Sequence, residues 1–174
     1  MKQKKVMLVD IDNTLANINK ELRKQGINTN VYPSPVPKDI WKDGTIYKDA
    51  KPILPIVNWV KRLSASKNNV LLYITSRPPE TKGITEKWLS KHIGISEPVF
   101  YTEGMPKGEA IKYYFGENAM REIEWVAIDD APHEIMSYLN LGIKEIFAPD
   151  WPYNRHIDDV YRLITDGRDL AAAR

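Results

Sequence analysis

The sequence predicts an α/β fold, in which a doubly wound parallel sheet has helices on both faces. Two observations support this fold class. Short apolar runs rich in Val and Ile alternate along the chain with amphipathic helical patterns, which is the order of repeated βαβ units. Within each run the apolar residues are largely consecutive rather than alternate, as is typical of strands that are buried on both faces.

The expected strands occupy residues 6–11, 70–76, 99–102, 125–130 and 144–148. The expected helices cover residues 53–63, 81–93, 108–115 and 132–141. In the first of these helices, Ile56, Val60 and Leu63 recur on one stripe, as in an amphipathic helix. Gly94 and Gly142 directly follow two of the helices and are natural helix ends.

The composition fits one ordered domain over residues 1–174, because 174 residues with 43% hydrophobic side chains can bury a core. No apolar run is long enough to span a membrane, and the apolar stretch at the basic N-terminus is too short for a signal peptide. The absence of Cys excludes disulfides, thiolate metal sites and Cys nucleophiles. We expect a cytoplasmic protein with no membrane partner. The net charge of +2 does not by itself indicate nucleic-acid binding.

Residues 16–50 interrupt the alternation of strands and helices. They include Pro33, Pro35 and Pro37, many polar residues and no clear strand. Such a segment, directly after an acidic strand end, is either a flexible loop or a small cap over the site, and we expect the cap. Residues 166–174 are expected to be a helix end or a frayed tail.

Polar, chemically capable side chains stand at the ends of three expected strands. They are Asp10 with Asp12, Thr75 with Ser76, and Asp129 with Asp130. In open α/β sheets, ligands bind beyond the carboxyl ends of the strands. Two acidic strand ends incur repulsion and desolvation, so they need a counter-charge, and oxygen ligands favour Mg²⁺ over zinc. In the alternative interpretation these Asp residues are only helix caps and turn residues.

The segment 10–14, DIDNT, resembles the DxDxT signature of the haloacid dehalogenase-like hydrolase superfamily. The later elements of that pattern follow in order: a strand ending at Thr75-Ser76-Arg77, a lysine at Lys107, and the acidic pair after residues 125–128. The resemblance covers residues 4–150. It implies that superfamily's Rossmann-like fold, with a small cap insert after the first strand.

The resemblance also implies roles for these residues. Asp10 is expected to attack phosphorus and become transiently phosphorylated, as carboxylate nucleophiles can. Asp12 is expected to protonate the leaving alkoxide and then to activate water. Its presence favours phosphate-ester chemistry, because the dehalogenase branch lacks a carboxylate at this position. Mg²⁺ is expected to bind Asp10, the backbone carbonyl of Asp12 and Asp129, with Asp130 beside it.

The remaining expected roles concern the phosphoryl group. Thr75 is expected to bind it through its hydroxyl, and Ser76 through its backbone N–H. Lys107 precedes a helical pattern and matches the superfamily's third motif, but Lys112 on the same helix is its rival. Arg77 is expected to grip the phosphate or shield the intermediate. The alternative for Arg77 is a structural pair with Glu80 at the sheet edge.

Shorter resemblances point to a branch of the superfamily. The Thr-Ser-Arg ending is similar to that of nucleotidases and of the phosphatase domain in polynucleotide kinase-phosphatases. The stretches 127–135, AIDDAPHEI, and 150–155, DWPYNR, are similar to motifs of the 5'(3')-deoxyribonucleotidase-like group. His133 in the first stretch is expected to be structural. Trp41, Tyr47, Trp151 and Tyr153 are candidates to stack on a base, although aromatic residues more often pack in a core.

The sequence therefore predicts a Mg²⁺-dependent phosphomonoesterase that works through an aspartyl-phosphate. Its expected partner is a phosphorylated small molecule, namely a nucleotide, or the 3'-phosphate end of a nucleic acid. A phosphatase of sugar or other metabolite phosphates shares the same chemistry and remains the alternative. A phosphate-binding module without turnover is a second alternative, but such a module would be expected to have lost one of Asp10, Asp12 and Asp129.

Overall fold

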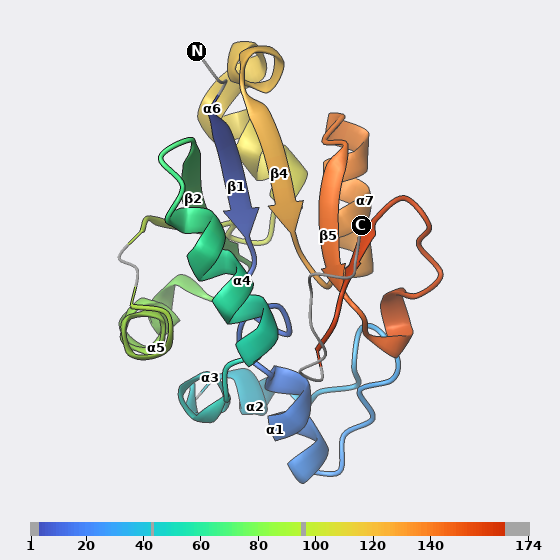
Figure 1. Cartoon of the computed structure of the whole chain (residues 1–174). Helices are drawn as coiled ribbons and strands as arrows, with labels where there is room; N and C mark the ends of the chain where they lie inside the picture. Colours follow the sequence, from blue (N-terminus) through green and yellow to red (C-terminus); the bar gives the residue numbers. More distant parts are fainter. Residues whose placement is uncertain (1–3, 43, 95–96, 166–174) are drawn as a thin grey trace.

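A six-stranded parallel sheet forms the centre of the computed structural model, which describes residues 4–42, 44–94 and 97–165 (Figure 1). The strands are β1 (Lys5–Val9), β2 (Asn69–Thr75), β3 (Val99–Tyr101), β4 (Glu124–Ile128), β5 (Glu145–Pro149) and β6 (Tyr161–Leu163). Their order in the sheet is β3-β2-β1-β4-β5-β6. The predicted fold class is confirmed. The five expected strands are present, with ends that differ by one or two residues.

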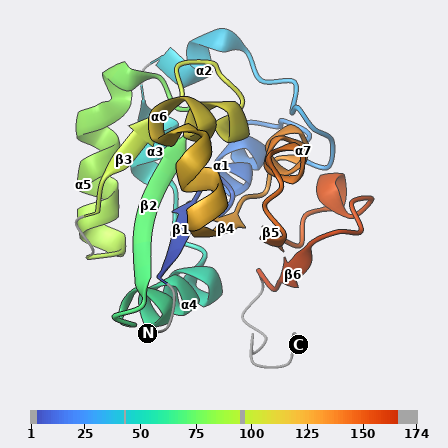
Figure 2. The same ribbon diagram turned by 90° about the horizontal axis from the view of Figure 1, so that it is seen from above.

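Two helical layers cover the sheet. Helices α4 (Leu54–Ser64) and α5 (Lys82–His92) belong to one layer, and α6 (Lys107–Glu122) and α7 (Pro132–Leu141) to the other. Figure 2 shows α4 on the opposite side of the sheet from α6 and α7. In β1, Val9 packs in the core cluster of α4, whereas the neighbouring Leu8 packs with Ile111 and Ile135 in the other cluster. Both faces of the strand are therefore buried, which explains its unbroken apolar run.

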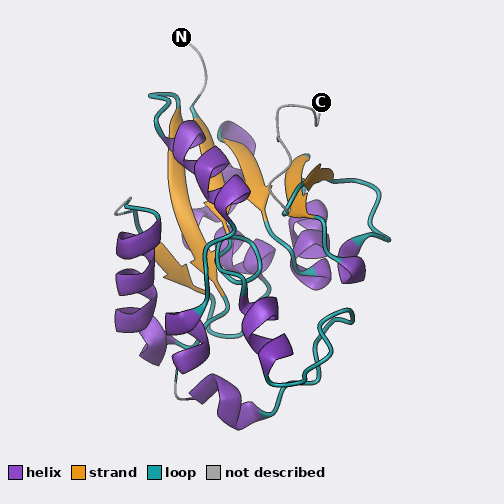
Figure 3. Ribbon diagram, turned by 60° about the horizontal axis from the view of Figure 1, so that its bottom comes forward, coloured by secondary structure: helices purple, strands orange, loops and turns teal. Residues whose placement is uncertain are grey.

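The segment between β1 and α4 contains three short helices that the sequence pattern did not predict. They are α1 (Ile18–Lys24), α2 (Lys38–Lys42) and α3 (Thr45–Asp49). Ile18, Leu22 and Ile46 are buried in the same cluster as α4. Figure 3 shows these helices beyond the end of the sheet to which the strands point. The insert is thus packed over the carboxyl ends of the strands, where a cap was expected rather than a flexible loop.

Two further differences from the expected elements have local causes. Helix α6 extends beyond the predicted 108–115, but its backbone is non-helical at Gly116 (φ 75°, ψ 167°), a conformation that glycine adopts easily. Strand β6 is only three residues long, too short for a periodic pattern. The tail expected at 166–174 lies outside the described residues. Among the described residues, no helix is long and apolar enough to cross a membrane.

The start of α6 lies directly against α7. A Cβ atom at Gly108 would be 2.4 Å from the backbone oxygen of Ser137, so only glycine fits this approach without a shift. The Gly108 N–H donates to the Ser137 hydroxyl at 3.0 Å. Because Lys107 precedes this contact, the close approach of the two helices fixes where its side chain begins.

We expect Gly108→Ala to destabilise the protein by about 1–3 kcal/mol, because the added methyl group overpacks against backbone that cannot rotate away. Urea unfolding measures this change. Gly83→Ala is the matched control, since nothing lies within 4 Å of a Cβ at that helical position. Equal stability of the wild type and Gly108→Ala would contradict the close packing.

Candidate active site

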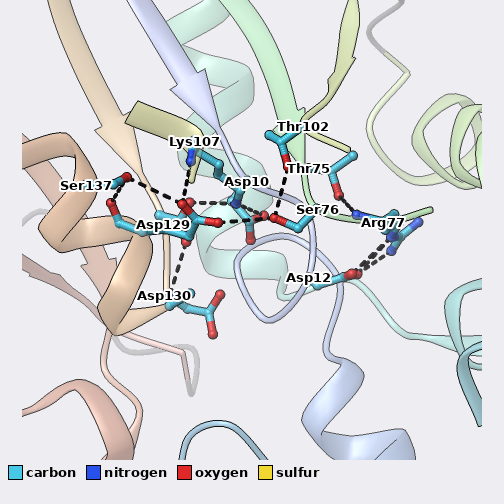
Figure 4. Close-up of polar contacts among 12 residues, drawn as sticks. Asp10, Asp12, Thr75, Ser76, Arg77, Thr102, Lys107, Asp129, Asp130 and Ser137 are labelled. Atoms are coloured by element: carbon cyan, nitrogen blue, oxygen red, sulfur yellow. Dashed lines mark hydrogen bonds and ion pairs between the residues drawn. The ribbon is translucent and has the colours of Figure 1, made fainter. Parts of the chain in front are cut away.

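The carboxyl ends of β1, β2 and β4 bring the sequence-predicted residues to one place (Figure 4). Asp10 directly follows β1, Thr75 ends β2, and Asp129 directly follows β4. The strands are neighbours and parallel, so these positions lie side by side at one edge of the sheet. Lys107 reaches the same edge from the start of α6.

Three buried carboxylates meet at this edge. Asp10, Asp129 and Asp130 are 4%, 0% and 3% exposed. Each offers an oxygen, and these oxygens lie within 4.8 Å of one another. Carboxylates that are removed from water and held this close repel one another strongly unless a positive charge compensates them.

Lys107 supplies part of that positive charge. Its Nζ lies 2.5 Å from Asp10 Oδ1 and 2.7 Å from Asp129 Oδ2, and its side chain is buried. Burial lowers the pKa of Lys107, but Asp10 and Asp129 outweigh this effect and hold the pKa well above its ordinary value. The rival Lys112 is exposed and pairs with Glu117 at 2.9 Å. The structure thus places Lys107, and not Lys112, in the site.

One ammonium group does not balance three carboxylates. Burial raises the pKa of Asp10 to about 7; Lys107 opposes this shift, while the charge of Asp129 adds to it. Burial, together with Asp10 and Asp129, also raises the pKa of Asp130 well above its usual range. The cluster therefore retains an excess of negative charge when its carboxylates are ionised.

The unsatisfied oxygen of Asp10 makes this cluster a fit for a divalent cation. Asp10 Oδ2 is buried and has no hydrogen-bond partner among the described residues. A buried carboxylate oxygen without a partner costs free energy. Mg²⁺ binds through carboxylate oxygens, so Asp10, Asp129 and Asp130 together offer the oxygen donors that such an ion requires.

The acidic pair after β4 is held by a second layer of contacts. The Ala131 N–H donates to Asp129 at 3.1 Å, and the Tyr138 hydroxyl donates to the same side chain at 3.2 Å. The Tyr153 hydroxyl donates to the Asp130 carboxylate. Asn154 donates to the Asp130 backbone carbonyl at 2.9 Å. The segment 150–155, which the sequence singled out by resemblance, thus orients Asp130.

Asp12 and Arg77 form a separate pair beside the cluster, as Figure 4 shows. Arg77 Nε lies 3.0 Å from Asp12 Oδ1, and Arg77 Nη2 lies 2.5 Å from the same oxygen. Arg77 Nη1 donates to Thr85 at 3.0 Å. Burial lowers the pKa of Arg77, but Asp12 outweighs it and the pKa is raised overall. In the described structure Arg77 therefore pairs with Asp12 rather than with Glu80.

The two hydroxyl residues at the end of β2 differ in their surroundings. Thr75 is buried, and its Oγ1 accepts the Arg77 backbone N–H at 3.2 Å. Ser76 is exposed toward the cavity, and its hydroxyl donates to Glu134 at 3.2 Å. Both border the same cavity as Asp10. Their expected contacts with a phosphoryl group stay predictions.

Glu134 is a site residue that the sequence reasoning did not assign. It is 2% exposed, and its Oε2 accepts the Lys107 backbone N–H at 2.6 Å. Its Oε1 lies 3.2 Å from His133 Nε2, and this pair raises the pKa of His133. A glutamate in the first turn of a helix usually faces water. In the sequence, only its position at the start of α7, just after the acidic pair, could have pointed to Glu134 as a site residue.

A cavity of about 460 Å³ opens over these residues. The sheet edge contributes Asp10, Asp12, Ser76, Lys107 and Asp130 to its wall. The insert contributes a mostly apolar wall, made of Ile18, Leu22, Tyr32, Pro33, Val36, Trp41 and Tyr47. The cavity therefore has one wall of charged residues, where a bound cation would offset the excess negative charge, and one wall that can contact an apolar or aromatic group.

Comparison with known proteins gives matches of structure only. No protein-family model matches the sequence, and no curated protein sequence matches it. A haloacid dehalogenase-like family hydrolase from Streptococcus pneumoniae superposes with a TM-score of 0.64 and 11% identity, over 95% of this chain and 96% of the other. A candidate beta-phosphoglucomutase from Thermotoga maritima gives a TM-score of 0.55 and 14% identity, over 97% and 91%.

A chain of the Pnkp1/Rnl/Hen1 complex gives a TM-score of 0.58 at 14% identity, and the match covers 85% of this chain. It spans only 46% of the other chain, so the shared part is about half of that protein. At identities this low, structural similarity shows a shared architecture but not a shared activity. The chain has the fold of the haloacid dehalogenase-like hydrolases, in agreement with its sequence motifs.

Proposed function

We propose that the protein is a Mg²⁺-dependent phosphomonoesterase in which Asp10 is the nucleophile. The observation that carries the proposal is the buried Asp10 itself, whose Oδ1 contacts Lys107 and whose Oδ2 has no partner in the described part of the chain. Lys107 orients one oxygen, and the other is left for a cation beside Asp129 and Asp130. A structural salt bridge would instead satisfy both oxygens.

The chain's own residues would carry the reaction in two steps. An Asp10 oxygen forms a bond to phosphorus while the bond between phosphorus and the leaving oxygen breaks, and Asp12 gives its proton to that oxygen. In the second step water attacks phosphorus, Asp12 takes a proton from this water, and the bond to Asp10 breaks. Lys107 holds Asp10 in place and offsets negative charge during both steps. Mg²⁺ bound by Asp10, Asp129 and Asp130 would offset the repulsion between the carboxylate and the phosphate.

The shape and lining of the cavity support a nucleotide, or the 3'-phosphate end of a nucleic acid strand, as the substrate. Tyr32 and Trp41 from the insert line the same cavity as the charged residues. Aromatic side chains stack on nucleobases without needing a particular base. A sugar phosphate would leave this apolar wall without a matching group, which makes it the weaker candidate.

Asp10→Asn is expected to abolish phosphate release from an activated aryl phosphate, because the neutral amide is a far weaker nucleophile than the carboxylate. The measurement is phosphate release, with thermal unfolding to check that the fold is retained. Asp159→Asn, which changes an exposed carboxylate outside the site, is the control. Normal turnover by Asp10→Asn would remove this residue from the mechanism.

Removal of divalent metal by EDTA is expected to stop activity, and added Mg²⁺ is expected to restore it. Because an ion that binds only the folded state stabilises it, Mg²⁺ should also raise the Tm of the wild type. Asp129→Asn should lose this rise, and potassium chloride at equal ionic strength is the control for screening. A rate that is insensitive to the chelator would contradict the metal requirement.

The substrate class is tested by phosphate release from 5'- and 3'-nucleotides, 3'-phosphorylated oligonucleotides and sugar phosphates at equal concentration. We expect kcat/KM to be highest for a nucleotide or a 3'-phosphorylated end. The comparison should be repeated with Trp41→Leu, which should lower kcat/KM for nucleotides more than for sugar phosphates. A preference for sugar phosphates in the wild type would favour the alternative function.

A further inference from the structure

The guanidinium group of Arg77 is buried and turned toward Asp12. Arg77 borders the cavity, yet its side chain has no exposed surface (0%), whereas that of Asp12 is 28% exposed. The donor edge formed by Nε and Nη2 is turned to the Asp12 carboxylate. This is the edge with which an arginine grips a phosphate through two parallel hydrogen bonds. Asp12 therefore occupies the place that a phosphate would need.

Two aromatic rings from the insert hold the guanidinium group in this position. Arg77 Cζ lies 4.4 Å from the ring centroid of Tyr47 in α3. Trp41 in α2 is stacked on Tyr47, with ring centroids 5.9 Å apart and an angle of 25° between the rings. A cation over the face of a tyrosine is attracted to it, more strongly where water is excluded. Thr85 in α5 binds Nη1 from the core side.

The two oxygens of Asp12 are held unequally. Oδ1 accepts from Nε at 3.0 Å and from Nη2 at 2.5 Å, whereas Oδ2 shares the Nε–H at 3.1 Å. Oδ1 is thus the anchored oxygen, and Oδ2 is the less tightly held one. A carboxylate fixed by one oxygen can present the other to a reacting group in a constant direction.

We propose that Arg77 is the positioning residue of the proton-transfer group Asp12, and that Tyr47 keeps Arg77 in place. This inference rests on the proposed function and assigns to the insert a part in proton transfer. When Asp12 gives its proton to the leaving oxygen, its contact with the fixed guanidinium group keeps the side chain in one orientation. When Asp12 later takes a proton from water, the same contact keeps its carboxylate in a constant position.

The inference is tested with Tyr47→Leu and Arg77→Met on two esters, an aryl phosphate with an activated leaving group and an alkyl phosphate. Only the alkyl ester needs a proton on its leaving oxygen. General acid catalysis contributes roughly 10²–10⁴-fold, so we expect Asp12→Asn to lose about that factor in kcat on the alkyl ester. Tyr47→Leu and Arg77→Met should each lower kcat on the alkyl ester at least about ten-fold, because they remove part of the contribution of general acid catalysis. Their kcat on the aryl ester should change much less.

Two further measurements separate positioning from phosphate binding and from a general loss of structure. Inhibition by inorganic phosphate should be unchanged in Tyr47→Leu, because the phosphate does not contact this ring in the proposed arrangement. Tyr47→Phe, which keeps the ring over Arg77, should retain the wild-type ratio of alkyl to aryl rates. Tyr113→Leu, which truncates an exposed tyrosine of α6, is the matched control.

Equal losses on both esters, together with weaker inhibition by phosphate, would overturn the inference and make Arg77 a phosphate ligand. A wild-type protein that hydrolyses no ester would contradict the proposed function instead. In that case the arrangement of Tyr47, Arg77 and Asp12 is tested by measuring the Tm of the variants. Tyr47→Leu should lower the Tm less in an Asp12→Asn background than in the wild type, and additive shifts would overturn the inference.

Discussion

Burying three carboxylates beside one lysine is the constraint on which the rest of this site depends. Asp10, Asp129 and Asp130 lie at adjacent strand ends with almost no contact with water. Lys107 contacts two of them and offsets part of their mutual repulsion, and the cluster is compatible with a divalent cation. Uncompensated charge of this kind destabilises a fold, and groups with perturbed pKa values are typical of functional sites.

The surrounding structure is arranged to keep that charge in place. Glu134 binds the backbone N–H of Lys107, and Gly108 allows α6 to approach α7 closely enough for this contact. Tyr153 and Asn154 come from the segment after β5 and bind Asp130. Each contact restricts a charged side chain that would otherwise move toward water. The outer contacts are therefore as much a part of the site as the carboxylates.

The fold itself is shared with proteins of very low sequence identity, so the fold does not determine the substrate. What differs among proteins that share a fold is the set of loops and inserts over the strand ends. In this chain the insert supplies an apolar and aromatic wall, and through Tyr47 it also reaches Arg77 behind Asp12. The insert thus bears on both parts of the proposed activity, namely which ester enters and how its leaving group is protonated.

The sequence by itself determined the fold class, the order of the main strands along the chain and the two acidic strand ends that contain Asp10 and Asp129. These follow from local patterns, because burial on both faces leaves an unbroken apolar run and a DxDxT segment needs no distant residue to be recognised. The same reasoning placed a lysine at the start of α6, although it left Lys107 and Lys112 both open.

Only the tertiary structure decided between those lysines, assigned Glu134 to the site and paired Arg77 with Asp12. These outcomes depend on residues far apart in the chain: the Arg77 pair joins positions 65 residues apart, and Lys107 and Asp10 are 97 residues apart. The short helices of the insert and strand β6 are equally non-local, because packing against the sheet, rather than their own periodicity, holds them. Which charged and polar groups meet depends on how distant segments pack together, so a local sequence pattern cannot identify these partners.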